Sequence, residues 1–221
     1  MAAIVIVGLI LYGTMVLKGE HYYLISLGVI VTGLLAAVVT FESGRPSAAR
    51  LTVLSVFIVT AVLSRLLLAP FPQVKPVAAV VLLGGVVLGK ESGFIIGMLS
   101  MFLSNFYFMQ GSWTPFQMFA MGLIGYLAGV FFYQKNAGIA TRIGIAVYGF
   151  FSVLIIYGGI VDINTVFFST GPEPEATGVL AVYLAGLPFD LVFAGTTAVV
   201  AFLLYPPMIR LWSRLEKKYV I

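Results

Sequence analysis

The sequence predicts an all-α polytopic membrane protein, and its composition and length lead to this class. Of the 221 residues, 61% are hydrophobic and only 9% are charged, and the mean hydropathy is +1.11. A soluble domain carries about 25% charged residues, so this chain could not cover a water-facing surface of that size. Its length allows seven or eight spanning helices of about 20 residues each, with short loops and no separate soluble domain.

Eight apolar runs, separated by short polar or Gly/Pro breaks, predict the helices in order. They cover residues 2–17, 22–41, 48–68, 75–89, 92–109, 115–134, 139–161 and 178–208. The first run has no basic segment before it and no cleavage site after it, so we interpret it as a retained helix and not as a signal peptide. The last run contains Pro188 and reaches Pro206 and Pro207, which predicts a kinked helix or an interfacial segment.

The fourth and fifth runs are short, and the break between them covers residues 89–93. Two structures fit: two spanning helices joined by a tight turn, or one re-entrant hairpin over residues 75–109. We favour two spans, because about 15 helical residues cover over 20 Å and flanking residues extend both. Glycines spaced four or five apart within 84–89, 93–97 and 125–129 predict close helix packing and not phosphate binding.

The distribution of lysine and arginine predicts the orientation. With eight spans and both termini on one side, that side carries nine basic residues: Arg45, Arg50, Lys90, Lys135, Arg142, Arg210, Arg214, Lys217 and Lys218. The other side carries Lys18 and Lys75, with Arg65 at its edge. Basic residues concentrate in cytoplasmic loops, so we expect a protein of the cell membrane with both termini in the cytoplasm. The acidic loop 162–178 then lies outside, and a seven-span arrangement would remove the bias.

Polar side chains near the predicted outer face are the candidates for binding a solute. They are Arg65, Lys75, Asn105, Gln110, Trp113, Gln117 and Asp190. Asn105 ends one predicted helix and Gln117 begins the next, so their amides are expected to face each other across a turn, beside the indole of Trp113. Two amides and an aromatic ring suit a neutral or zwitterionic heteroaromatic ligand. The alternative is an aromatic belt at the outer membrane interface.

Two ionisable residues in predicted helices each have a structural and a functional interpretation. Arg65 is either an interfacial residue that extends to lipid headgroups or a cation lining an outward-facing pocket. Asp190 lies near the predicted bilayer midplane, where a carboxylate must be paired, protonated or exposed to a polar cavity. A hydrogen bond between helices and a contact with a ligand or coupling ion both satisfy that requirement.

The inventory of reactive residues argues against an enzyme. The chain has no cysteine and a single histidine, His21, which excludes thiolate catalysis, disulfides and Cys- or His-rich metal sites. It has no phosphate-binding loop for ATP, and Asp190 has no second intramembrane aspartate with which to form a protease pair. We therefore expect no catalytic residue, cofactor or metal, and the placement of the basic residues gives no indication of nucleic-acid binding.

Residues from about 50 to 129 resemble the substrate-binding S components of energy-coupling factor (ECF) vitamin transporters. The matching segments are the helix ending in Arg65, the following FPQVKP, and SNFYFMQGSWTPFQM at residues 104–118. The loop of the form QGxWTPxQM is most similar to the cobalamin-type subgroup. The C-terminal PFDLVFAG and PPMIRLWSRLEKKY are also similar, so the resemblance covers roughly residues 48–218.

This resemblance implies a six-helix S-component core with a basic cytoplasmic tail over residues 46–221, preceded by two extra transmembrane helices within 1–45. It implies a subunit that binds a vitamin from outside, with cobalamin as the leading candidate, and delivers it through a membrane-embedded T component with two cytoplasmic ATPases. The seven candidate residues would contact the vitamin. The alternatives are an S component for another vitamin such as riboflavin, a stand-alone ion-coupled transporter in which Asp190 titrates, and a purely structural membrane protein.

The chain departs from the S-component pattern in two respects that bear on function. Phe193 stands where the subgroup tends to have a histidine three residues after the aspartate, so an Asp–His pair is lost. The small-residue stripe by which S components meet the T component is less strict here, and consists of Ala48, Thr52, Val56 and Thr60.

Overall fold

A computed structural model describes residues 2–15, 28–29, 31–33, 35–36, 39, 47–133, 135–136, 138–170 and 175–219. All its elements are helices: α1 (Ala2–Met15), α3 (Ala48–Leu67), α4 (Val77–Leu88), α5 (Lys90–Phe108), α6 (Trp113–Phe132), α7 (Ile139–Phe151), the π-helical segment η1 (Ser152–Gly158), α8 (Gly159–Thr170) and α9 (Ala176–Tyr219). Four stretches in the described residues are long and apolar enough to cross a membrane: Ala48–Leu67, Trp113–Phe132, Ile139–Val166 and Ala176–Lys218. The predicted class, an all-α polytopic membrane protein, is confirmed.

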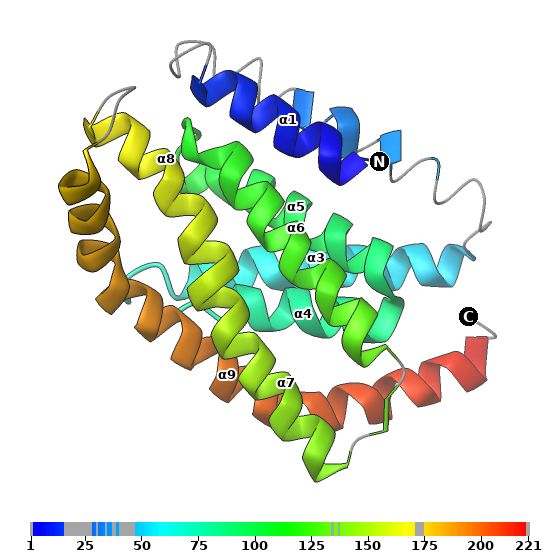
Figure 1. Cartoon of the computed structure of the whole chain (residues 1–221). Coiled ribbons are helices and arrows are strands. Elements are labelled where there is room, and N and C mark those ends of the chain that lie inside the picture. The colour runs from blue at the N-terminus through cyan, green and yellow to red at the C-terminus, as the bar shows by residue number, and fades with distance from the viewer. Residues whose placement is uncertain are drawn as a thin grey trace.

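Each of the six apolar runs after residue 47 becomes one helical rod. α7, η1 and α8 follow one another without a break and form the long diagonal rod in Figure 1. The sequence predicted that this helix ends at residue 161 and that 162–178 is a loop, but the helix continues to Thr170. The reason is that the polar residues after 161 are compatible with helical packing: Asn164, for example, is buried. Asp162 is consequently a helical residue of α8.

α4 is the central helix of the bundle. Every residue from Val77 to Leu88 is buried, and α3, α5, α6 and α9 pack around it. A helix that is apolar on all sides fits a protein core or the lipid phase, and here it occupies the core. Gly89 joins α4 to α5 with a φ of 92°, a conformation that a glycine adopts without strain. The structure thus has two helices joined by a tight turn, which both two spans and a re-entrant hairpin would show. α4 has 12 residues, about 18 Å, so whether it crosses the bilayer stays a prediction.

Glycines allow α4, α5 and α6 to approach backbone to backbone, as their spacing predicted. A Cβ atom added at Gly85 would lie 2.1 Å from the carbonyl oxygen of Gly125, and one at Gly93 would lie 2.3 Å from the same oxygen. A Cβ at Gly97 would lie 2.3 Å from the carbonyl oxygen of Met121. Lipid is as apolar as a leucine side chain, so helices in a membrane associate through close packing of this kind. The three helices form a rigid base for the residues at their ends.

α9 has 44 residues and changes direction along its length (Figure 1), consistent with its three internal prolines. Pro206 has no N–H, so the carbonyl of Phe202 loses its helical partner. Arg142 of α7 donates an Nε–H hydrogen bond to that oxygen at 2.7 Å, and its guanidinium lies 3.8 Å from the centre of the Phe202 ring. α9 therefore remains helical through Pro206 and Pro207, and Arg142 of α7 stabilises it at this point.

The N-terminal region adds helical segments to the outside of this six-rod bundle. α1 packs on α6, and the described residues between 28 and 39 are all helical, as the second apolar run predicts. A Cβ at Gly33 would lie within 2.1 Å of the sulfur of Met98, so this segment packs closely on α5. Lys18, His21 and Arg45 lie outside the described residues.

Candidate functional site

Arg65 is buried at the end of α3, where the chain turns toward α4. Its side chain is 7% exposed. Its Nη1 group donates hydrogen bonds to Ser104 Oγ at 2.5 Å and to Asn105 Oδ1 at 2.7 Å, both on α5. The guanidinium carbon lies 4.5 Å from the centre of the Phe108 ring. The side chain thus turns into the protein, and the alternative in which it extends to lipid headgroups does not describe this structure.

Asn105 continues this hydrogen-bond network from α5 to α6. Its side chain is fully buried, and its Nδ2 group donates to Thr114 Oγ1 at 3.1 Å and to Gln117 Oε1 at 2.9 Å. The Asn105 and Gln117 amides therefore face each other across the turn, as the sequence predicted. Thr114 Oγ1 also accepts a hydrogen bond from the backbone N–H of Gly111, which fixes the turn itself. Because Gln117 uses its oxygen in this network, its two N–H groups are left to donate, and the hydroxyl of Tyr157 is one of their partners.

A small cavity of about 70 Å³ lies next to this network. That volume holds several water molecules. Its wall brings together Arg65, Gln73, Lys75, Val77, Met101, Gln117, Tyr157 and Phe193, from α3, the loop after it, α4, α5, α6, η1 and α9. The cavity is therefore the point at which most of the bundle converges.

The loop between α3 and α4 covers the cavity with Gln73 and Lys75. The Lys75 ammonium lies 4.8 Å from the centre of the Phe108 ring, so Arg65 and Lys75 contact the same aromatic residue. Burial, followed by the nearby charge of Arg65, lowers the pKa of Lys75 below its usual value. Gln73 has a φ of 56°, which is uncommon for a residue with a side chain. Strained backbone of this kind clusters at ligand-contacting loops.

The π-helical segment places Tyr157 at the cavity. η1 interrupts the α-helical pattern of the α7–α8 rod over Ser152–Gly158, and short π-helical segments are frequent at functional sites. Tyr157 contacts Phe193 of α9 edge to face, with ring centres 5.2 Å apart. Phe193, the residue in place of the expected histidine, thus forms part of the cavity wall.

The structure brings Arg65, Lys75, Asn105 and Gln117 together and places the other three candidates elsewhere. Gln110 donates its side-chain N–H to the carbonyl of Phe102 at 3.0 Å and closes the end of α5. The Trp113 ring covers Gly111, where a Cβ would lie 2.5 Å from it, and the side chain is 38% exposed. Neither residue lines the cavity.

Asp190 packs against the π-helical segment. A Cβ added at Gly158 would lie 2.4 Å from its Oδ2 atom, so only a glycine leaves room for this carboxylate. Asp190 is one helical turn from Phe193 on α9 but does not line the cavity itself. Asp162 packs in the same manner on Gly186, and its buried Oδ2 has no hydrogen-bond partner among the described residues.

Sequence reasoning missed Gln73 and Tyr157 as cavity residues. Gln73 belongs to the FPQVKP loop that was recognised, and an amide beside a lysine was a usable signal. Tyr157 gave no such signal, because its direction depends on a π-helical turn that hydrophobic periodicity does not detect.

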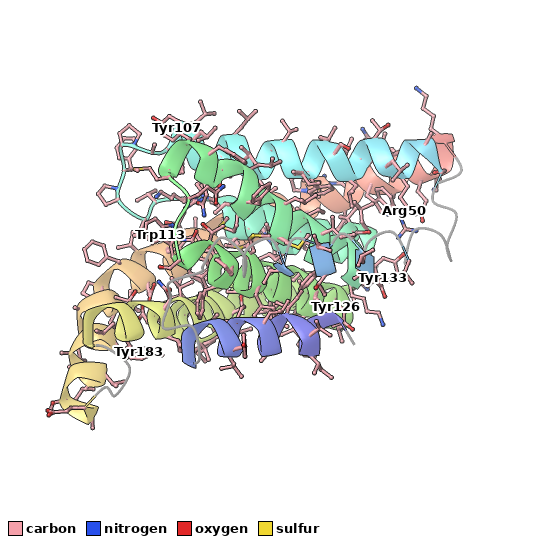
Figure 2. All side chains as sticks on the ribbon, turned by 90° about the horizontal axis from the view of Figure 1, so that it is seen from above. Arg50, Tyr107, Trp113, Tyr126, Tyr133 and Tyr183 are labelled. Atoms are coloured by element: carbon pink, nitrogen blue, oxygen red, sulfur yellow. The ribbon has the colours of Figure 1, made fainter. Side chains whose placement is uncertain are left out.

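The opposite end of the bundle gathers basic residues that contact backbone carbonyls. Arg50 donates to the carbonyl of Leu88 at 2.6 Å, at the last turn of α4. Figure 2 shows Arg50 and Tyr133 at this end, and Tyr107 and Trp113 at the cavity end. Lys90 forms an exposed ion pair with Glu91, 3.8 Å apart. The residues predicted to be cytoplasmic and those predicted to be external are thus separated along the bundle.

A second hollow, an apolar groove of about 250 Å³, runs between α3 and the C-terminal part of α9 with α4 as its floor. Thr52, Val56 and Thr60 of the predicted small-residue stripe line it, opposite Met208, Leu211 and Trp212. Ala48, the fourth member of the stripe, does not.

The comparison with known families gives one match. Residues 45–214 match DUF6580, a family of unknown function, and the chain therefore belongs to this family. No curated protein and no solved structure matches the chain.

Proposed function

We propose that this member of DUF6580 is a membrane-embedded substrate-binding subunit of an ECF-type importer. It captures a small, vitamin-type solute at the outer face and passes it inward with a T component and two cytoplasmic ATPases. The observation that carries the proposal is the polar cavity at one end of an otherwise apolar bundle. Buried polar groups in a membrane protein are costly and are retained where they serve a ligand or a pathway.

The placement of the cavity supports capture from outside. It lies at the end of the bundle that carries Arg65 and Lys75, and the basic residues Arg50, Lys90 and Arg142 occupy the other end. By the distribution of positive charge, the cavity end faces outward and both termini face the cytoplasm. A solute would therefore reach the cavity through the loop that carries Gln73 and Lys75.

The groove between α3 and α9 is the proposed docking surface for the T component. Val56 is 57% exposed at this groove, and three of the four stripe residues line it. An apolar groove that accepts a helix uses side chains spaced by one helical turn, and Thr52, Val56 and Thr60 have that spacing. The chain has no ATP-binding motif, so an ATP-driven importer of this kind needs a partner that carries the ATPases.

The first experiment asks whether the protein alone binds a solute. Full-length protein is purified gently in detergent and analysed by native mass spectrometry for a co-purifying small molecule, with cobalamin and riboflavin included as added ligands. We expect saturable, nanomolar-range binding without nucleotide. A corrinoid would also colour the protein. Absence of saturable binding to every compound of a vitamin panel would contradict the proposal.

The second experiment asks whether the groove docks a partner. Val56→Trp fills the groove, and Val59→Trp is the matched control, because Val59 is 55% exposed on the same helix but does not line the groove. In liposomes with T component and ATPases, we expect Val56→Trp to abolish uptake but to leave solute binding intact. Val59→Trp should retain both activities. Equal uptake by the two variants would exclude docking through this groove.

A stand-alone ion-coupled transporter is the second candidate, and one observation favours it. Asp162 and Asp190 lie on neighbouring helices at the cavity end, and an oxygen of Asp162 has no hydrogen-bond partner among the described residues. This candidate predicts uptake driven by an ion gradient in liposomes that lack any ATPase, and loss of that uptake in Asp190→Asn. Strict dependence on the T component and ATPases excludes it.

A further inference from the structure

The cavity has a cationic wall with no acidic partner. Arg65 and Lys75 both line it, and the other lining residues are uncharged. Among the described residues, neither cation forms an ion pair; the pair of Lys90 and Glu91 is at the opposite end. Burying a cation costs free energy unless an anion or several acceptors compensate it.

The hydrogen bonds of Arg65 use only one of the three nitrogens of its guanidinium group, whose planar, forked arrangement of N–H donors is called the Arg65 fork below. Both of its hydrogen bonds to protein come from Nη1. The N–H groups of Nη2 and Nε have no acceptor among the described residues, although the side chain is only 7% exposed. These N–H groups form the planar edge that binds a carboxylate through two parallel hydrogen bonds.

The neighbouring side chains add donors to the same wall. Gln117 accepts from Asn105 through its oxygen, so its two N–H groups can donate; the hydroxyl of Tyr157 is one partner of these groups, which leaves a donor for a ligand. Lys75 contributes an ammonium group, and Tyr157 contributes a hydroxyl. A neutral, amide-rich ligand needs donors and acceptors in balance, but this wall offers mainly donors and two positive charges.

We infer that the solute bound in this cavity is an organic anion whose carboxylate is held by the Arg65 fork, with Lys75 and Gln117 as further donors. The inference rests on the proposed function and specifies its substrate class. A cavity of about 70 Å³ holds the carboxylate group and not a whole vitamin. The rest of the solute therefore requires movement of the loop that carries Gln73 and Lys75. A corrinoid, which is far larger and presents neutral amides, fits this wall poorly.

The test compares acids with neutral partners of the same shape. Detergent-purified full-length protein is titrated with nicotinate against nicotinamide, pantothenate against pantothenol and biotin against biotinamide, with cobalamin as a seventh compound. We expect one carboxylate to bind at least about tenfold more tightly than its neutral partner, because charge-assisted hydrogen bonds are about twice as strong as neutral ones. Equal binding of both partners, or tighter binding of cobalamin, overturns the inference.

Matched variants assign the effect to the cavity. Arg65→Gln should weaken binding of that carboxylate by at least about tenfold and remove the preference over the neutral partner. Arg65→Lys, which keeps the charge and loses the fork, should give an intermediate loss. Lys75→Gln, in the loop, should also weaken binding of the carboxylate. This variant tests the inference even if the variants of the buried Arg65 do not fold. Lys90→Gln, a lysine at the opposite end, should bind like the wild type. Full binding by Arg65→Gln or Lys75→Gln overturns the inference.

The outcomes separate this inference from the proposed function. If a neutral solute binds with nanomolar affinity and its uptake requires the T component, the proposed function stands and the anionic substrate class is wrong. If none of the seven compounds binds, the result contradicts both the proposed function and the anionic substrate class. If a carboxylate binds through Arg65 but its uptake needs no ATPase, the substrate class stands and the ECF assignment fails.

Discussion

Arg65 and Arg142 lie at opposite ends of the same bundle and use their guanidinium groups differently. Arg142 donates to the carbonyl of Phe202, which Pro206 has deprived of its helical partner. Arg65 donates to two side chains and leaves the rest of its donors at a cavity. An arginine at one end of the bundle therefore satisfies a backbone carbonyl, and an arginine at the other end keeps N–H groups available for a ligand. What distinguishes a structural cation from a ligand-binding one is whether its donors are already used.

The largest effect is expected in the core that connects the two ends. In Gly125→Ala the new Cβ would lie 2.2 Å from the carbonyl oxygen of Gly93, and backbone atoms cannot move away cheaply. We expect a loss of about 3 kcal/mol of unfolding free energy, or failure to fold. Thermal unfolding in detergent measures it. Gly195→Ala, in a helix with nothing within 4 Å of the new atom, should be neutral or slightly stabilising. Similar behaviour of the two variants would contradict the close-packed core.

The second effect tests the structural role of Arg142. Arg142→Ala removes both the hydrogen bond to the Phe202 carbonyl and the contact with the Phe202 ring. We expect a loss of about 2 kcal/mol of unfolding free energy, with solute binding unchanged. Arg210→Ala is the control, since that side chain is exposed and bonds only within α9 among the described residues. If Arg142→Ala weakened solute binding without loss of stability, the contrast between the two ends would be wrong.

The third effect concerns Arg50, which satisfies the carbonyl of Leu88 at the C-terminal end of α4. A cation is favourable at that end of a helix, where the carbonyl groups carry partial negative charge. Arg50→Gln should reduce the unfolding free energy by about 1 kcal/mol and leave solute binding unchanged. Thermal unfolding together with titration of the bound carboxylate checks both statements. A variant as stable as the wild type would show that the contact contributes nothing.

Local sequence patterns predicted the helices and several of the contacts. Apolar runs predicted the six rods, and glycine spacing predicted close helix packing, which the structure shows where Gly93 meets Gly125. The turn between two helices predicted that Asn105 lies opposite Gln117. Each of these follows from neighbours in sequence or from helical repeat.

The remaining contacts depend on how whole helices are rotated and placed. The pairing of Arg142 with Phe202 joins residues 60 positions apart, and no local pattern specifies it. Tyr157 reaches the cavity because η1 changes the helical register. The ring of Trp113 covers Gly111 and does not line the cavity, an orientation set by the turn and not by the residue type, and its contact with a ligand stays a prediction.

The smallest effect is a pH dependence that arises from Lys75. Its pKa is lowered in the folded protein, so the unfolded chain binds more protons between that pKa and the usual 10.5, and stability should rise as pH increases through this window. The other charged or titratable residues that line the same cavity are Arg65 on α3 and Tyr157 on η1. We expect the unfolding temperature of wild type, relative to Lys75→Gln, to rise from pH 8 toward pH 10.5. A bound carboxylate should reduce that rise, because an anion stabilises the protonated lysine. Lys90→Gln should keep the wild-type dependence. A flat difference between wild type and Lys75→Gln would mean that Lys75 faces solvent, and would leave Arg65 as the single cation at the cavity.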